Sequence, residues 1–100
     1  MAQSVPSGWT QANNVLTRTI QRADFVEALA FTLQVGKLAE RADHHPDIDI
    51  RYRTVHLSLS THSAGSTVTD KDFALAREIN DLREDDIRLT KDDLRSRFSR

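Results

Sequence analysis

The chain has 100 residues, a size typical of one domain with a core of modest extent. Its 14 basic and 15 acidic residues leave a formal net charge of −1, which excludes a basic field for nucleic acid or an anionic membrane. The absence of cysteine excludes disulfides, thiolate metal sites and a cysteine nucleophile. Because no segment resembles a signal peptide or a membrane span, we expect a cytoplasmic protein.

Residues 9–22 predict a β-hairpin. Its two segments are WTQA, from Trp9, and VLTRTIQ over residues 15–21. Asn13 and Asn14 separate them, and asparagine tolerates the left-handed backbone that a tight turn needs. Leu16 and Ile20 lie on one face of the second segment, because side chains alternate along a strand.

An amphipathic helix is predicted from Phe25 to about Asp43. Asp24 is placed to cap its N-terminus, with Glu27 three residues on as a capping partner. Apolar residues then recur at the spacing of one helical stripe. The helix cannot continue far past Asp43, because Pro46 disfavours helical geometry at the residue before it.

The C-terminal end of this helix carries a polar cluster. Glu40 falls at the edge of the apolar stripe, where an acid is either a boundary residue or a group aimed into a cleft. His44 and His45 lie at the helix end and in the turn beyond it. Two adjacent imidazoles are awkward to bury, because each has a donor and an acceptor that need partners.

Residues 47–62 contain two runs of alternating apolar residues that are out of phase. Arg53 and Thr54 lie between the runs, so either two strands meet at a tight turn or one strand carries a bulge. His56 lies on the polar face and is expected in solvent. His62 follows near the C-terminal end of the second run.

A second helix is predicted after Thr69, which is placed as its N-cap with Asp72 as a capping-box partner. The following charged tail has sparse apolar residues and predicts either a short helix from near Thr90 or a mobile segment. We therefore expect one domain over residues 1–88 and a charged C-terminal extension over 89–100.

The order of predicted elements is β-β-α-β-β-α. The economical arrangement is an α+β two-layer domain, with a four-stranded antiparallel sheet and helices on one face.

The candidate chemistry lies in Glu40, His44, His45 and His62. Glu40 and His44 are four residues apart and can approach each other across the last helical turn, and histidine is well suited to proton transfer near neutral pH. A metal site is the weaker hypothesis, because adjacent histidines do not easily bind one ion and no H-E-x-x-H spacing is present. Each residue also has a plain structural interpretation as a polar helix end, a boundary residue or a strand-end residue.

Several separated motifs resemble the pterin-4a-carbinolamine dehydratase family over roughly residues 8–82. They are D-F-x-x-A-x-x-F at 24–31, V-x-x-x-A-E at 35–40, HHPD at 44–47, Tyr52, V-H-L-S-L-S-T-H at 55–62, Ala64-Gly65 and T-D-K-D-F-A-L-A at 69–76. The loop between His62 and Asp72 is one residue longer than the usual family spacing.

This resemblance implies the dehydration of 4a-hydroxytetrahydrobiopterin to quinonoid dihydropterin, which recycles tetrahydrobiopterin after an aromatic amino acid hydroxylase has used it. It also implies a homodimer or homotetramer, with no metal or tightly held cofactor. The implied site is Glu40, His44, His45 and His62, with Trp9 and Asp72 as lesser, substrate-binding members.

For the chemistry we expect His44 and His62 to be the acid/base pair, in an order that the sequence does not decide. His45 would bind or orient the substrate, and Glu40 would hold an imidazole in one tautomer and support its positive form.

Three rival functions remain. The chain could be a non-catalytic module that binds a transcription factor, an assembly factor on the same fold, or a metal-dependent hydrolase. The complete set of Glu40 and three histidines favours the dehydratase over the first two, because a scaffold has no reason to keep it.

Overall fold

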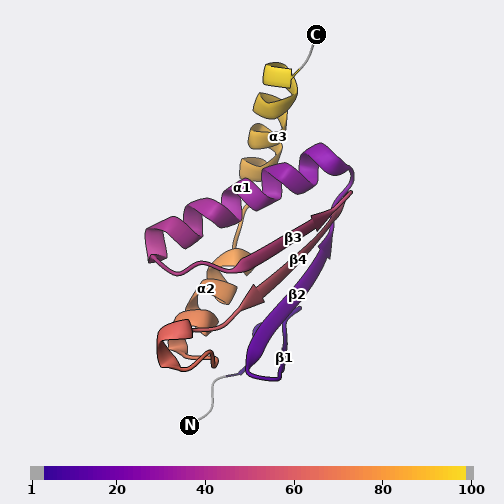
Figure 1. Ribbon diagram of the computed structural model, residues 1–100. Helices are drawn as coiled ribbons and strands as arrows, with labels where there is room; N and C mark the ends of the chain where they lie inside the picture. The colour runs from indigo at the N-terminus through magenta and orange to yellow at the C-terminus, as the bar shows by residue number, and fades with distance from the viewer. Residues whose placement is uncertain (1–3, 99–100) are drawn as a thin grey trace.

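A computed structural model describes residues 4–98; residues 1–3 of the predicted domain and residues 99–100 of the predicted extension lie outside this range. In chain order the elements are β1 (Thr10–Ala12), β2 (Val15–Gln21), α1 (Phe25–Ala42), β3 (Asp47–Arg51), β4 (Thr54–Leu59), the short 3-10 helix η1 (His62–Ala64), α2 (Asp70–Asn80) and α3 (Glu84–Phe98). The strands form one antiparallel sheet in the order β1-β2-β4-β3 (Figure 1). The predicted α+β fold is confirmed, with a third helix.

One face of the sheet is apolar and carries the helices. In the β2–β4 register Leu16 pairs with Leu59 and Ile20 with Val55, and these four side chains are buried. The alternating residues of β2 and β4 on the opposite face are polar apart from Val15 at the start of β2, as expected from the pleat of a half-buried antiparallel sheet. The helices therefore cover a single face, and Figure 1 shows them on one side of the sheet.

Both hairpins turn through left-handed residues. Asn13 and Asn14 have φ values of 53° and 63°, which confirms the predicted turn. The two out-of-phase runs in residues 47–62 are two strands, β3 and β4, joined by a tight turn. Arg51 pairs with Thr54 across this turn. Tyr52, with φ of 56°, belongs to this turn rather than to the strand, because the phase change falls there.

The two ends of α1 are set by local signals. The Asp24 carboxylate accepts a hydrogen bond from the Glu27 N–H at 2.8 Å, which confirms the N-cap. The Glu27 carboxylate does not cap in return, because it pairs with Arg22 at 2.8 Å. At the other end Asp43 is left-handed, with φ of 49°, so the chain reverses direction just before His44.

Helix α3 begins at Glu84 rather than near Thr90, so the predicted boundary between residues 88 and 89 falls inside it. Acidic residues in its first turn favour this earlier start, because they interact well with the helix dipole. Ile87 is fully buried. The helix docks against α1 and then extends away from the sheet (Figure 1). No helix within residues 4–98 is long and apolar enough to cross a membrane.

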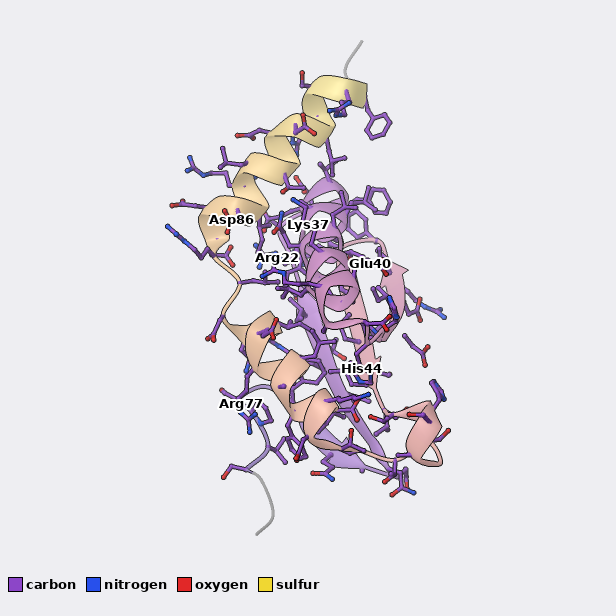
Figure 2. All side chains as sticks on the ribbon, turned by 90° about the vertical axis from the view of Figure 1, so that its left-hand side faces the viewer. Arg22, Lys37, Glu40, His44, Arg77 and Asp86 are labelled. Atoms are coloured by element: carbon purple, nitrogen blue, oxygen red, sulfur yellow. The ribbon has the colours of Figure 1, made fainter. Side chains whose placement is uncertain are left out.

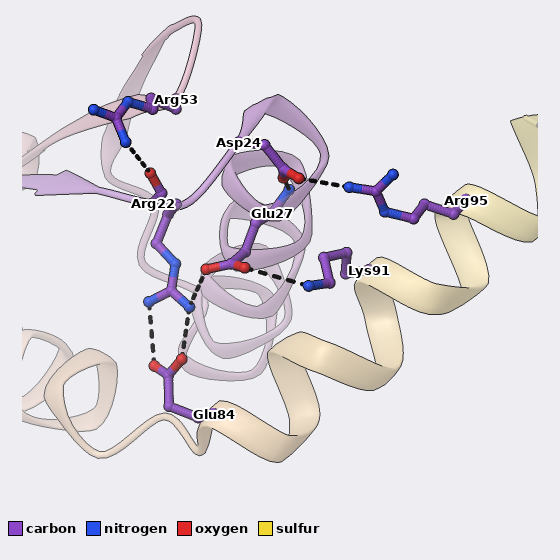
Figure 3. A network of polar contacts seen from close by, with 7 residues as sticks. All are labelled: Arg22, Asp24, Glu27, Arg53, Glu84, Lys91 and Arg95. Carbon is purple, nitrogen blue, oxygen red and sulfur yellow. Dashed lines mark hydrogen bonds and ion pairs between the residues drawn. The ribbon is translucent and has the colours of Figure 1, made fainter.

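Ion pairs join α3 to the start of α1 (Figure 3). Arg22 contacts Glu84 at 2.6 Å and Glu27 at 2.8 Å. The same Glu27 carboxylate meets Lys91 at 3.4 Å. Further along, Arg95 contacts the capping residue Asp24 at 2.5 Å. The charged tail is therefore held on α1 by complementary charges as well as by Ile87.

We expect Ile87→Ala to lower the free energy of unfolding by about 2–4 kcal/mol, because it removes a buried branched side chain and leaves a cavity. The matched control is Leu89→Ala on the same helix, since Leu89 is 62% exposed. Urea unfolding of both variants measures the difference. Equal effects would mean that α3 does not dock on the core.

The Arg22–Glu84 pair also predicts a small pH dependence. The side-chain hydrogen bond from Arg22 lowers the pKa of Glu84 below its ordinary value of 4.5. The pair therefore stabilises the fold above about pH 4.5, and this contribution is lost as the pH falls through the lowered pKa. Because the Glu84 side chain is largely exposed, we expect less than about 1 kcal/mol. Glu84→Gln should flatten the stability curve in this acid range.

Candidate active site

His44 is held between the end of α1 and the start of α2 (Figure 2). The left-handed Asp43 ends the helix, and the His44 N–H donates to the Ala39 carbonyl at 3.1 Å. The imidazole is mostly buried, and its Nε2 lies 2.5 Å from Asp72 Oδ1. The predicted approach of Glu40 to His44 is therefore wrong, because the reversal at Asp43 takes His44 off the helical surface.

Asp72 is completely buried and accepts several hydrogen bonds. While Oδ1 contacts His44, Oδ2 accepts hydrogen bonds from the Thr69 N–H at 2.8 Å and from the Thr61 hydroxyl at 2.7 Å. The predicted capping role of Asp72 is present, but capping accounts for only one of its oxygens. The other oxygen orients an imidazole, a contact that the capping pattern could not reveal.

Glu40 serves the second histidine. Its Oε2 lies 2.5 Å from His45 Nε2, and both side chains are more than half exposed, at 80% for Glu40 and 55% for His45. Each neighbouring histidine thus has its own carboxylate, one buried and one in solvent. The buried pair is the more sharply positioned, because burial excludes the water that would compete for its hydrogen bonds.

His62 lies near His44 and His45 but comes from a different segment, the short helix η1. It begins η1 rather than ending a strand, and its Nδ1 lies 3.3 Å from the Ser66 hydroxyl. The ring is exposed. The sequence predicts His62 near the C-terminal end of the second run, but β4 ends at Leu59 and the chain turns helical at His62, because Thr61 pairs with Thr67 and closes a tight loop.

These three histidines line one pocket of about 250 Å³. Its other lining residues, which were not predicted as members of the site, are Asp43, Ser60, Thr61, Ser63 and Lys71. Only their closeness to the histidines in sequence could have suggested them. A larger hollow of about 460 Å³ lies between α1, α2 and α3, but its charged lining includes none of the predicted site residues.

Trp9 does not line the histidine pocket. It is 6% exposed, and its indole N–H donates to Asn80 Oδ1 at 3.0 Å. Asn80 ends α2, whereas Asp72 lies in the first turn, so about 12 Å of helix separates them. Arg18 also donates to the same Asn80 oxygen. Trp9 thus anchors the N-terminal segment to the far end of α2, and its role in substrate binding stays a prediction.

The hydrogen bonds decide which ring nitrogens are available. A carboxylate only accepts hydrogen bonds, so Nε2 of His44 carries a hydrogen toward Asp72, and Nε2 of His45 does so toward Glu40. Among residues 4–98, no hydrogen bond engages Nδ1 of either ring or Nε2 of His62, so these nitrogens remain for a ligand. Imidazole nitrogens from two chain segments can thus exchange protons with one bound molecule.

Within residues 4–98, no group of three or more histidine and carboxylate side chains is arranged to hold a metal ion. Two of the histidines instead pair with separate carboxylates.

The model of the pterin 4 alpha carbinolamine dehydratase family matches residues 1–82. The chain belongs to this family. A relative from Roseiflexus castenholzii is 53% identical over 76 residues, covering 76% of this chain and 81% of its own length. One from Nocardia farcinica is 50% identical over 80 residues, covering 80% and 82%. Both carry the name pterin-4-alpha-carbinolamine dehydratase as a provisional assignment. Helix α3 lies beyond the matched residues.

Solved structures of the dehydratase family share the fold. A Brucella melitensis protein described as a transcriptional coactivator/pterin dehydratase is 36% identical, with a TM-score of 0.69, and the match covers 74% of this chain and 80% of that one. A pterin dehydratase-like protein described as a RuBisCO assembly factor of the alpha-carboxysome is 19% identical, with a TM-score of 0.60 over 72% and 84%. The second likeness concerns the fold alone.

Proposed function

We propose that the chain dehydrates 4a-hydroxytetrahydrobiopterin to quinonoid dihydropterin and water. The observation that carries the proposal is the pairing of His44 with the buried Asp72 carboxylate in a pocket that His62 also lines. A flat bicyclic heterocycle between these rings would meet nitrogen atoms able to give and to accept protons. Membership of the dehydratase family supports this substrate class.

The reaction needs two proton movements. One proton goes to the hydroxyl oxygen on carbon 4a, which leaves as water as its carbon–oxygen bond breaks. A ring N–H loses its proton, and the nitrogen electron pair forms the new double bond to carbon 4a. His44 through Nδ1 and His62 through Nε2 serve these two transfers, in an order left open. His45 orients the ring, and Glu40 fixes the tautomer of His45.

In this proposal the Asp72 carboxylate stabilises the positively charged form of His44, which exists before the ring gives a proton or after it takes one. A general acid or base at the correct distance typically contributes 10²–10⁴-fold in rate. No step requires a metal or a cofactor. Tetrahydrobiopterin recycling, a hydroxylase that supplies the substrate, a cytoplasmic location and a homodimer or homotetramer belong to the same proposal.

A stopped-flow assay tests the proposal directly. The hydroxypterin intermediate is generated in the mixing cell, and its ultraviolet decay is followed with and without the protein. We expect faster decay that is proportional to protein concentration. Decay at the uncatalysed rate, with folded protein, would leave the dehydratase proposal without support.

A protein-binding role is the second candidate, favoured by the coactivator description of the Brucella relative. Such a role does not need the His44–Asp72 pair. A folded protein that fails the decay assay but binds a partner equally well with His44 replaced would favour this candidate.

A further inference from the structure

Thr61 lines the histidine pocket but is almost fully buried, and nothing in the chemistry proposed above uses it. Its side chain is 4% exposed, and the residue directly precedes His62. Its hydroxyl donates to Asp72 Oδ2 at 2.7 Å. Because a hydroxyl has a single hydrogen, the Thr69 hydroxyl is the donor in its 2.6 Å contact with Thr61 Oγ1.

The backbone around Thr61 is held in place as well. The Thr61 N–H donates to the Thr67 carbonyl at 2.8 Å. Its carbonyl accepts from the N–H groups of Ala64 and Ser66, both at 3.1 Å. The hydroxyl is thus presented from a closed loop with little freedom to turn away from the carboxylate.

A chain of hydrogen bonds therefore runs from Thr69 through Thr61 and Asp72 to His44. Asp72 Oδ2 is engaged by two donors from the α2 cap and the η1 loop, which leaves Oδ1 directed at the imidazole. A buried carboxylate with all of its donors in place is both charged and fixed in orientation. Loss of one donor would leave the carboxylate freer to rotate away from His44.

We propose that Thr61 is a positioning residue that acts through Asp72 to keep His44 in the Nε2–H tautomer, with Nδ1 facing the pocket. Its relevance to catalysis rests on the dehydratase function proposed above. The hydrogen-bond chain itself does not. Thr61 needs no contact with substrate, so its effect falls on the chemical step rather than on binding.

The test compares Thr61→Val, which keeps the shape but removes the hydroxyl, with Thr61→Ser, which keeps the hydroxyl. We expect Thr61→Val to lower kcat about 10–100-fold, as when the hydrogen-bond partner that orients a metal-binding histidine is lost, with KM nearly unchanged. Thr61→Ser should restore kcat to near the wild-type value. Wild-type kcat in folded Thr61→Val, or an equal loss in Thr61→Ser, would overturn the proposal.

Nitrogen-15 resonances of the His44 ring give a readout that needs no catalysis. Wild type and Thr61→Ser should show a protonated Nε2 and an unprotonated Nδ1, whereas Thr61→Val should move toward averaged tautomers. If Thr61→Val does not fold, the wild-type spectrum still decides, because a protonated Nδ1 would overturn the proposal. The wild type could also fail the decay assay while the His44 tautomers of all three proteins are as expected. That result would contradict the dehydratase function but support the positioning role of Thr61.

Discussion

His62→Ala is expected to lower kcat for hydroxypterin dehydration about 10²–10⁴-fold, the range for loss of a general acid or base. The ring is exposed, and its Nδ1 lies 3.3 Å from the Ser66 hydroxyl. The substitution therefore removes an imidazole nitrogen from the pocket without opening a cavity in the core. The thermal midpoint should stay close to that of the wild type.

His56→Ala is the matched control for this variant. His56 lies on the polar face of β4, opposite the helices, and its Nδ1 contacts the Thr19 hydroxyl at 2.8 Å. Both substitutions delete one exposed imidazole, but only His62 lines the pocket. Stopped-flow decay should separate the two variants clearly. Near-normal turnover of His62→Ala would mean that its assignment to the proton transfers is wrong.

Asp72→Asn should lower kcat by up to about 10⁴-fold through the tautomer of His44, the size of the loss when asparagine replaces the aspartate that orients a catalytic histidine. The amide oxygen can keep the bonds from Thr61 and Thr69, which leaves the amide N–H group facing His44. The imidazole must then accept through Nε2 and carry its hydrogen on Nδ1, the nitrogen proposed to exchange a proton with the substrate. The variant also loses the negative charge that supports a positive His44.

Asp70→Asn is the control, because it removes the same charge from the same helical turn at an exposed position. We expect it to retain activity. Circular dichroism and urea unfolding should show both variants folded, with a cost of about 1 kcal/mol for the altered cap in Asp72→Asn. The proposed role of Asp72 would be contradicted by a folded Asp72→Asn variant that turns over like Asp70→Asn.

Local sequence signals were sufficient for most of the fold. The paired asparagines, the alternation in residues 15–21 and 55–59, and the caps at Asp24 and Thr69 each act over a few neighbours, so they can be read without tertiary structure. Errors arose where contacts outside the helical turn compete with a local rule. The Glu27 carboxylate turns to Arg22 and Lys91 instead of capping. Helix α3 starts early because Ile87 is buried in the core.

The sequence by itself determined which side chains could do the chemistry, because the HHPD motif and the later T-H segment contain the three histidines. The order of the strands and helices along the chain then brings these segments to one end of the sheet. Only the tertiary structure decided their partners. Glu40 pairs with His45 rather than His44, and Asp72 and Thr61 reach His44 across separate segments. The reason is geometric: a left-handed residue at Asp43 redirects the chain, and long-range hydrogen bonds then depend on where α2 and η1 pack.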